Sequence, residues 1–153
     1  ISDLRNPAEV AGDLPAALQE VTDRYRDQPG AAVRLDLRDS PPRLAARTVH
    51  HLRMITAEAV SNALKHAEPT EVIIELQIKG GELDLTIADD GCGFDQELET
   101  RGKAGHFGCV GIRERCRALG GNAQWTSQSG EGTRLKISLP LDASTMDTYP
   151  LAT

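Results

Sequence analysis

Hydrophobic positions along this chain follow two periods, one typical of helices and one typical of strands. Apolar residues at helical spacing predict a first helix over 14–25, which Asp13 can cap and Pro15 can open. Every second residue is apolar over 33–37, which predicts a short strand. A long helix is then predicted over 43–67, because an apolar stripe runs along one side of it.

The second half of the chain predicts two hairpins with a loop and a helix between them. Alternating apolar residues over 72–78 and 83–87 form the first hairpin around a glycine turn. A helix is predicted over 108–119, and the last hairpin joins 123–127 to 135–139. This order of elements indicates an α+β fold, a two-layer sandwich in which helices cover one face of a mixed, mostly antiparallel sheet.

The length of 153 residues suits one domain, which we assign to residues 14–140. Residues 1–13 are assigned to a linker, and residues 141–153 to a flexible tail, because the stretch from Asp142 onward is small and polar. The chain starts at Ile1 rather than at a methionine, so we expect it to be a piece of a longer protein.

The composition excludes several classes of function. A formal net charge of -6 argues against a general nucleic-acid binder and against a basic membrane-surface module. No stretch approaches the roughly 18–20 apolar residues that a membrane span needs. Cys92, Cys109 and Cys116 lack CxxC spacing, so we expect reduced thiols in a cytoplasmic domain rather than disulfides or a zinc site.

Four polar side chains of the long helix fall within roughly 100° of one another, because they lie at i, i+4, i+7 and i+8. They are an acid, an amide, an ammonium and an imidazole: Glu58, Asn62, Lys65 and His66. The acid and amide oxygens suit Mg²⁺, and the cation suits phosphate oxygens. A solvated helix face is the alternative interpretation.

Three glycine-containing segments are further candidates for a binding site. Residues 89–93 (Asp-Asp-Gly-Cys-Gly) follow a strand, where an aspartate can accept a hydrogen bond from an exocyclic amine. Residues 105–111 open a helix, where backbone N–H groups suit a phosphate. Residues 130–133 (Gly-Glu-Gly-Thr) lie in the last hairpin. Taken singly, each segment also reads as an ordinary turn or helix cap.

The order and spacing of these segments resemble the GHKL ATPase superfamily, whose ATP-binding fold is the Bergerat fold. Within it the chain resembles the catalytic domain of bacterial sensor histidine kinases. EAVSNALKHA (58–67) is similar to that family's N box, and ADDGCGFD (88–95) to its first glycine box. GHFGCVGIRERC (105–116) is similar to the second glycine box, and its residues are close to those of the subfamily that partners NarL-type response regulators. SGEGTRLKISLP (129–140) is similar to the closing strands.

The resemblance implies a site for the adenine of ATP. Asp89 takes the position that holds the adenine amine, and Thr133 supports it through an ordered water. Gly91 and Gly93 take the positions at which the chain turns beside the base.

The resemblance also implies a site for Mg²⁺ and the phosphates. Asn62 takes the position of the Mg²⁺ ligand, and Glu58 one that assists at the metal or the attacking group. Lys65 and His66 match positions that contact phosphates. Residues from about 94 to 111 would form the ATP lid, in which three glycines give mobility and N–H donors: Gly105, Gly108 and Gly111.

The resemblance implies an enzyme whose phosphoacceptor domain lies outside this chain. The phosphoacceptor histidine would belong to a dimerisation domain outside this chain, joined to it through residues 1–13, and a NarL-type response regulator would receive the phosphoryl group. His50 and His51 lack the acidic residue that follows a phosphorylated histidine in this family, so we expect them to be structural. The isolated chain should be a monomer that binds ATP without phosphorylating itself.

Two other functions are compatible with the same motifs. One is an anti-sigma-factor serine kinase on this fold, which the GIRER motif (111–115) disfavours. The other is a docking module that binds ATP without catalysis, which the complete set of motif residues disfavours. Among nearby side chains, Trp125 is expected to pack on its strand and Arg115 to lie on a solvated helix face. For Arg113 the sequence does not decide between a contact with phosphate or a partner and a solvated helix face.

Overall fold

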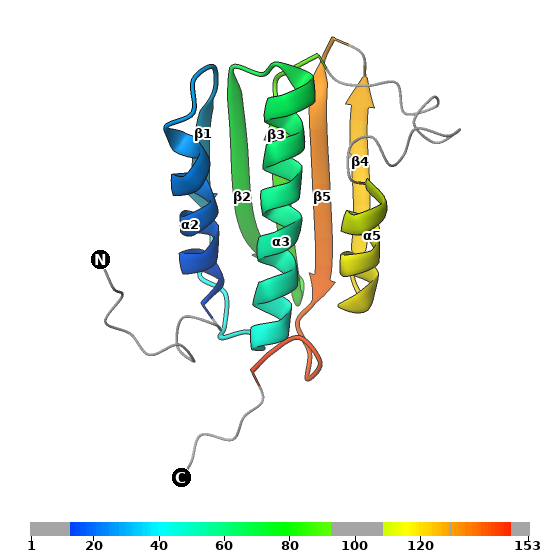
Figure 1. The fold of residues 1–153 in the computed structure, drawn as a ribbon. Coiled ribbons are helices and arrows are strands. Elements are labelled where there is room, and N and C mark those ends of the chain that lie inside the picture. The colour runs from blue at the N-terminus through cyan, green and yellow to red at the C-terminus, as the bar shows by residue number, and fades with distance from the viewer. Residues whose placement is uncertain (1–12, 93–108, 129, 148–153) are drawn as a thin grey trace.

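Five strands form one sheet, and helices cover a single face of it, within residues 13–92, 109–128 and 130–147, which this computed structural model describes (Figure 1). The strands lie in the order β1-β2-β3-β5-β4. Only β1 and β2 pair in parallel, and the other pairs are antiparallel. The predicted α+β class and the mixed, mostly antiparallel sheet are therefore confirmed. The strands are β1 (Ala32–Leu37), β2 (Glu71–Lys79), β3 (Glu82–Asp89), β4 (Asn122–Gln128) and β5 (Gly132–Pro140).

The helix layer consists of α2 (Leu14–Arg26), α3 (Ala46–Asn62) and α5 (Cys109–Ala118). Asp13 caps α2 as predicted, because its Oδ1 accepts the N–H of Ala16 at 3.0 Å. None of the described helices is long and apolar enough to cross a membrane.

The core lies between the two layers, because every second strand residue faces the helices. Fully buried leucines and isoleucines come from three neighbouring strands: Ile74 and Leu76, Leu83 and Leu85, and Ile137 and Leu139. From α3, Leu52 and Ile55 meet them at helical spacing. The other face of the sheet carries charged residues, including the exposed Lys136 and the half-buried Asp84, which form an ion pair. This alternation fixes which strand residues can face a site under the helices.

The long helix differs from its prediction at both ends. It begins at Ala46 rather than at residue 43, and its α-helical part ends at Asn62. Residues Ala63–Ala67 continue as a π-helix, whose i to i+5 hydrogen bonds place more residues in each turn than an α-helix does. Glu68 then ends the element in a left-handed conformation, with φ of 50°.

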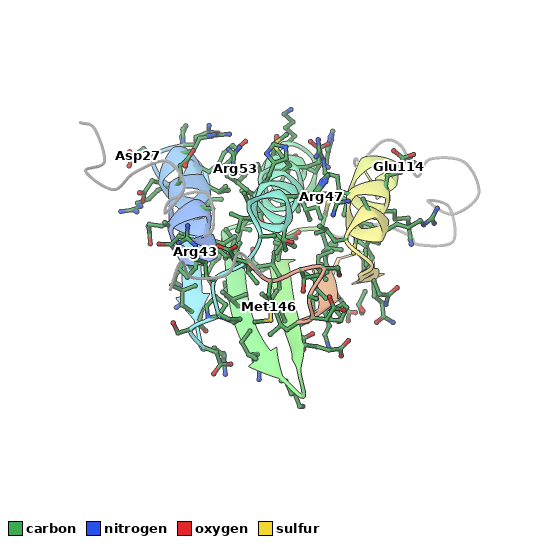
Figure 2. The ribbon with its side chains drawn as sticks, turned by 90° about the horizontal axis from the view of Figure 1, so that it is seen from below. Asp27, Arg43, Arg47, Arg53, Glu114 and Met146 are labelled. Carbon is green, nitrogen blue, oxygen red and sulfur yellow. The ribbon has the colours of Figure 1, made fainter. Side chains whose placement is uncertain are left out.

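Residues 142–147 pack against the start of α3, which differs from the expectation that the chain frays from Asp142 onward. The N–H of Ala45 donates to the carbonyl of Thr145 at 3.0 Å, and Leu44 and Met146 form a β-bridge. Arg43 pairs with Asp147 at 2.9 Å, and Figure 2 views the molecule from this end. The packed structure therefore extends beyond residue 140. Residues 1–12 and 148–153 lie outside the described part, so the linker and tail assignments stay predictions there.

Two contacts hold α5 beside α3. The guanidinium of Arg115 lies 3.2 Å from Nδ1 of His51, and that of Arg47 donates to the carbonyl of Ala118 at 2.7 Å. Arg115 is half-buried rather than fully solvated, so its expected place on a solvated helix face was wrong. Burial and the nearby charge of Arg115 lower the pKa of His51. These contacts fix α5 over β4, at one side of the site described next.

Candidate functional site

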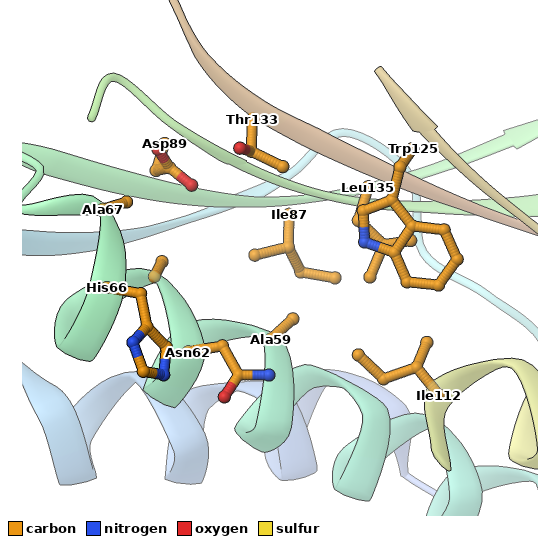
Figure 3. A pocket seen from close by; sticks show the side chains of 11 residues that line it. Ala59, Asn62, His66, Ala67, Ile87, Asp89, Ile112, Trp125, Thr133 and Leu135 are labelled. Carbon is orange, nitrogen blue, oxygen red and sulfur yellow. The ribbon is translucent and has the colours of Figure 1, made fainter. Parts of the chain in front are cut away.

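A cavity lies between α3 and the sheet, at the end where β3 finishes and β5 begins (Figure 3). Its floor is one row of cross-strand partners, in which Ile87 pairs with Leu135 and Leu135 pairs with Trp125. All three side chains are apolar or aromatic, and they come from three adjacent strands. The register of the sheet thus builds a flat hydrophobic surface that suits a planar ring.

The next row of the sheet is polar and borders this floor. Asp89 pairs with Thr133, and Thr133 pairs with Ser127, so the row crosses the same three strands. The hydroxyls of Ser127 and Thr133 lie 2.9 Å apart, and Ser127 Oγ also donates to the carbonyl of Gly132 at 3.1 Å. Asp89 and Thr133 line the cavity, which therefore has a hydrophobic floor with hydrogen-bonding groups along one edge.

The helices supply the opposite wall. Asn62 and His66 line the cavity from the helix side, and Ile112 of α5 lines it from another side (Figure 3). Two further helix residues that line the cavity, Ala59 and Ala63, have small side chains. Two alanines at this spacing leave room between helix and sheet that larger side chains would fill.

The π-helix separates the four polar residues that the sequence placed on one helix face. Because each π-helical residue advances by a smaller angle, Lys65 is turned further from the line of Asn62, while Asn62 and His66 both line the cavity. Glu58, Lys65 and His66 are all exposed, but Lys65 and Glu58 are not among the lining residues. Of the four residues on the predicted polar face, Asn62 and His66 therefore line the cavity, and Lys65 and Glu58 do not.

The two neighbouring aspartates of the Asp-Asp-Gly segment have different environments. Asp89 points into the cavity, and its Oδ1 accepts the N–H of Gly91 at 2.9 Å. Burial raises the pKa of Asp89, although hydrogen bonds from the backbone of Gly91 and Thr133 oppose the rise. Asp90 instead accepts hydrogen bonds from the hydroxyl of Thr70 and from the N–H groups that open β2, and these lower its pKa. Asp89 is thus the residue available to a ligand, and Asp90 is structural.

Close packing holds the Asp-Asp-Gly segment against the end of the helix. A Cβ added at Gly91 would lie 2.3 Å from the carbonyl oxygen of Ala67, so a larger residue does not fit there. The next N–H, that of Cys92, donates to the same carbonyl at 2.7 Å. Gly91 therefore serves the site by bringing Asp89 next to the helix end rather than by lining the cavity.

The other predicted site residues fall into two groups. Gly111 lies in the first turn of α5, exposed and away from the cavity lining. Gly93, Gly105 and Gly108, with most of the predicted lid, lie outside the described residues. The structure thus brings together Asn62, His66, Asp89 and Thr133 from the predicted set.

The sequence reasoning missed several residues of the site, among them the cavity-lining Ile87, Leu135, Ile112 and Trp125, and Ser127, which contacts Thr133. Trp125 was expected only to pack on its strand, yet it lines the cavity. The guanidinium carbon of Arg113 lies 4.5 Å from the centre of a Trp125 ring, a cation–π contact that holds this guanidinium against the cavity wall. Alternation along β4 puts Trp125 and Ser127 on one face, but only the strand register shows that this face meets Asp89.

Residues 48–143 match the protein family described as histidine kinase-, DNA gyrase B- and HSP90-like ATPases. The sensor histidine kinase YdfH of Bacillus subtilis is 35% identical over 137 residues, which cover 89% of this chain and 33% of YdfH. The nitrate/nitrite sensor protein NarQ of Escherichia coli is 37% identical over 127 residues, which cover 82% of this chain and 22% of NarQ. The chain thus spans about a third or less of these relatives.

Solved structures share the fold. The blue-light activated histidine kinase EL346 of Erythrobacter litoralis superposes with a TM-score of 0.73 at 23% identity, over 84% of this chain and 42% of that one. The ATP binding domain of PrrB from Mycobacterium tuberculosis superposes with a TM-score of 0.66 at 23% identity, over 84% of this chain and 93% of that one.

Proposed function

Because this chain belongs to the family of histidine kinase-, DNA gyrase B- and HSP90-like ATPases, we propose that it is the ATP-binding catalytic domain of a sensor histidine kinase. It binds Mg-ATP in the cavity under α3 and presents the γ-phosphoryl group to a histidine of another domain. The sensor histidine kinases among its relatives, YdfH and NarQ, support this proposal.

The observation that carries the proposal is the edge formed by Asp89 and Thr133 beside the floor of Ile87, Leu135 and Trp125. A carboxylate accepts hydrogen bonds from an exocyclic amine, and an apolar floor stacks against a planar base. Adenine offers both features. We therefore assign Asp89 to the adenine amine, with Thr133 beside it.

The phosphates of the nucleotide would extend along the helix wall. Asn62 and His66 line the cavity there, so an amide and an imidazole face the place where the triphosphate leaves the base site. Transfer of a phosphoryl group depends mainly on positioning and on neutralising charge. Lys65 and Glu58 lie on the exposed side of the same helix segment, where they are available to the outer phosphates or to the acceptor domain.

Mg²⁺ fits the donor set, although the described residues contain no group of three acidic, histidine or cysteine side chains that would hold a metal by themselves. The ion usually binds to only one or two protein oxygens and takes its other ligands from phosphates and water. The amide oxygen of Asn62 is such a ligand, with Glu58 one turn earlier on the helix. Bound there, Mg²⁺ would neutralise charge on the phosphate oxygens.

The phosphoacceptor lies outside this chain in our proposal. His51 contacts Arg115 and packs edge-on to His50 with ring centres 5.7 Å apart, so both serve the helix layer. The acceptor would be a histidine on a dimerisation domain of the same kinase. A NarL-type response regulator would then receive the phosphoryl group, and the domain would work in the cytoplasm, where ATP is available.

Calorimetric titration with a non-hydrolysable ATP analogue, with and without Mg²⁺, tests the nucleotide site. We expect affinity on the order of micromolar for the wild type and its loss in Asp89→Asn, because the amide presents a donor where the adenine amine needs an acceptor. Asp90→Asn is the matched control, since this neighbouring carboxylate faces Thr70 instead of the cavity. A folded wild type that binds no nucleotide would overturn the proposed function, and an Asp89→Asn variant of unchanged affinity would overturn the adenine assignment.

A further inference from the structure

The floor of the cavity ends at the edge of the sheet, and its last residue is Trp125. The strand that carries it, β4, is outermost in the order β1-β2-β3-β5-β4, so in the described sheet it pairs with β5 alone. Trp125 lines the cavity and is half-buried, whereas its cross-strand partner Leu135 is buried. Because no further strand of that sheet flanks β4, the outer end of the floor depends on how the indole is held.

A side chain of α5 covers the indole. The buried stripe of this helix includes Ile112 and Cys116. At about 100° per residue, Arg113 and Arg115 lie on opposite flanks of that stripe. Arg115 extends toward α3, where it contacts His51. Arg113 therefore extends the other way, toward the edge strand β4.

Arg113 reaches the ring of Trp125 without being part of the cavity wall. Its guanidinium carbon lies 4.5 Å from the centre of an indole ring, although Arg113 is exposed and is not among the residues that line the cavity. A guanidinium is planar and weakly hydrated, so it lies readily against an aromatic face. At this edge of the sheet it supplies packing that a neighbouring strand supplies elsewhere.

We propose that Arg113 is a positioning residue for nucleotide binding, which acts by holding the indole of Trp125 in place as the outer wall of the base site. The inference rests on the proposed function, and it adds a residue that does not touch the nucleotide. A base that enters the cavity then meets a ring that is already ordered, so less side-chain entropy is lost on binding. The sequence left Arg113 undecided between a phosphate, a partner and solvent, and this geometry favours a fourth role.

Calorimetric titration of Arg113→Ala with adenosine and with a non-hydrolysable ATP analogue tests this role. We expect both affinities to fall by the same factor, about two- to fivefold, which is the range of one exposed cation–π contact. An arginine that bound phosphate directly would weaken the binding of the ATP analogue alone. The emission of Trp125, the single tryptophan of the chain, should also shift to longer wavelength and be quenched more readily by acrylamide, because the indole loses its cover.

Arg117→Ala is the matched control, because Arg117 is exposed one turn later on α5 and its replacement removes the same charge. It should leave both affinities and the emission unchanged. Arg113→Lys keeps a cation that can lie over the ring, so it should retain more affinity than Arg113→Met, which keeps only an aliphatic stem. In the Trp125→Leu background, Arg113→Ala should have no further effect on either affinity.

The two compounds and the double variant separate the possible outcomes. A loss confined to the ATP analogue, or an equal loss in the Trp125→Leu background, would show that Arg113 acts on the nucleotide directly and would overturn the inference. Unchanged affinities in Arg113→Ala would overturn it as well, while the proposed function would stand. A folded wild type that binds neither compound would overturn the proposed function itself.

Discussion

Gly132 packs directly against the backbone of Asp89. A Cβ built on Gly132 would lie 2.2 Å from the carbonyl oxygen of Asp89, which is far inside van der Waals contact. Gly132 also has φ of 86°, a conformation that residues with a side chain rarely adopt. The start of β5 therefore touches the end of β3 at the residue that we assign to adenine, and only glycine permits that approach.

Replacing Gly132 with alanine should destabilise the protein and weaken nucleotide binding together, because the methyl group pushes β5 away from Asp89. Gly130→Ala is the matched control, since Gly130 has φ of 83° and no atom within 4 Å of an added Cβ. We expect the control to cost roughly 1–2 kcal/mol of unfolding free energy from backbone strain alone, and Gly132→Ala to cost clearly more. Urea denaturation measures both, and equal losses would contradict the steric argument.

Asp89 should make stability depend on pH in a recognisable way. Its pKa is raised in the folded state, so the folded protein holds this proton at pH values where the unfolded chain has released it. The free energy of unfolding of the wild type, relative to Asp89→Asn, should therefore fall as pH rises from the ordinary aspartate value to the raised one, and stay level above it. Nucleotide affinity should show the opposite trend, because the proposed adenine contact needs the carboxylate.

Asp90 provides the opposite case on the same segment. Its pKa is lowered by Thr70 and by backbone N–H groups, so its stabilising effect is present above the ordinary aspartate value and is lost as pH falls through the lowered one. Unfolding curves of Asp90→Asn across acidic pH should show this difference from the wild type. Parallel pH profiles for the two variants would show that the environments of these carboxylates do not differ as the structure indicates.

Asn62 should matter more for phosphoryl transfer than for binding. Its amide faces the cavity in the place assigned to the metal, so Asn62→Ala should misplace the γ-phosphoryl group. We expect autophosphorylation of the intact kinase to slow by about a hundredfold, while calorimetry shows a much smaller change in nucleotide affinity. Ser61→Ala is the control, as the preceding helix residue does not line the cavity. Phosphoryl transfer at the wild-type rate in Asn62→Ala would contradict the assignment of Asn62 to the metal site.

His66 should contribute more to nucleotide binding than Lys65 does, although the sequence alone treats them alike. Both side chains are exposed, but His66 lines the cavity and Lys65, which the π-helix turns away from the line of Asn62, does not. His66→Ala should weaken the affinity for the ATP analogue by about two- to tenfold, and Lys65→Ala by less. A larger loss for Lys65→Ala would mean that the π-helical turn does not decide which side chain meets the phosphates.

Local patterns in the sequence were sufficient to predict most elements and several site residues. Alternation of apolar residues gave both hairpins, and Asp13 marked the start of α2. Asp89, Thr133 and Asn62 were identified from the resemblance of their motifs to those of the histidine kinase family, and the structure brings them to one cavity. The elements depend on periodicity and on neighbours in the chain, which a sequence displays directly.

Other features were decided only by the tertiary structure. The fold of residues 142–147 follows from their packing on the start of α3, since nothing in their small polar composition indicates order. The π-helical turn that separates His66 from Lys65 lies next to the tight packing of Gly91 on Ala67, a contact between segments far apart in sequence.

The position of Ser127 beside Thr133 shows the same division most clearly. Alternation along its strand predicts the face on which Ser127 lies, but not which side chain of β5 it meets. That choice depends on strand register, because a shift by one residue would turn every side chain to the opposite face. The sequence by itself therefore determined the elements and the chemical groups of this site. The pairing of β3, β5 and β4 placed Asp89, Thr133 and Ser127 in one row, since cross-strand neighbours are brought together by hydrogen bonds between distant segments.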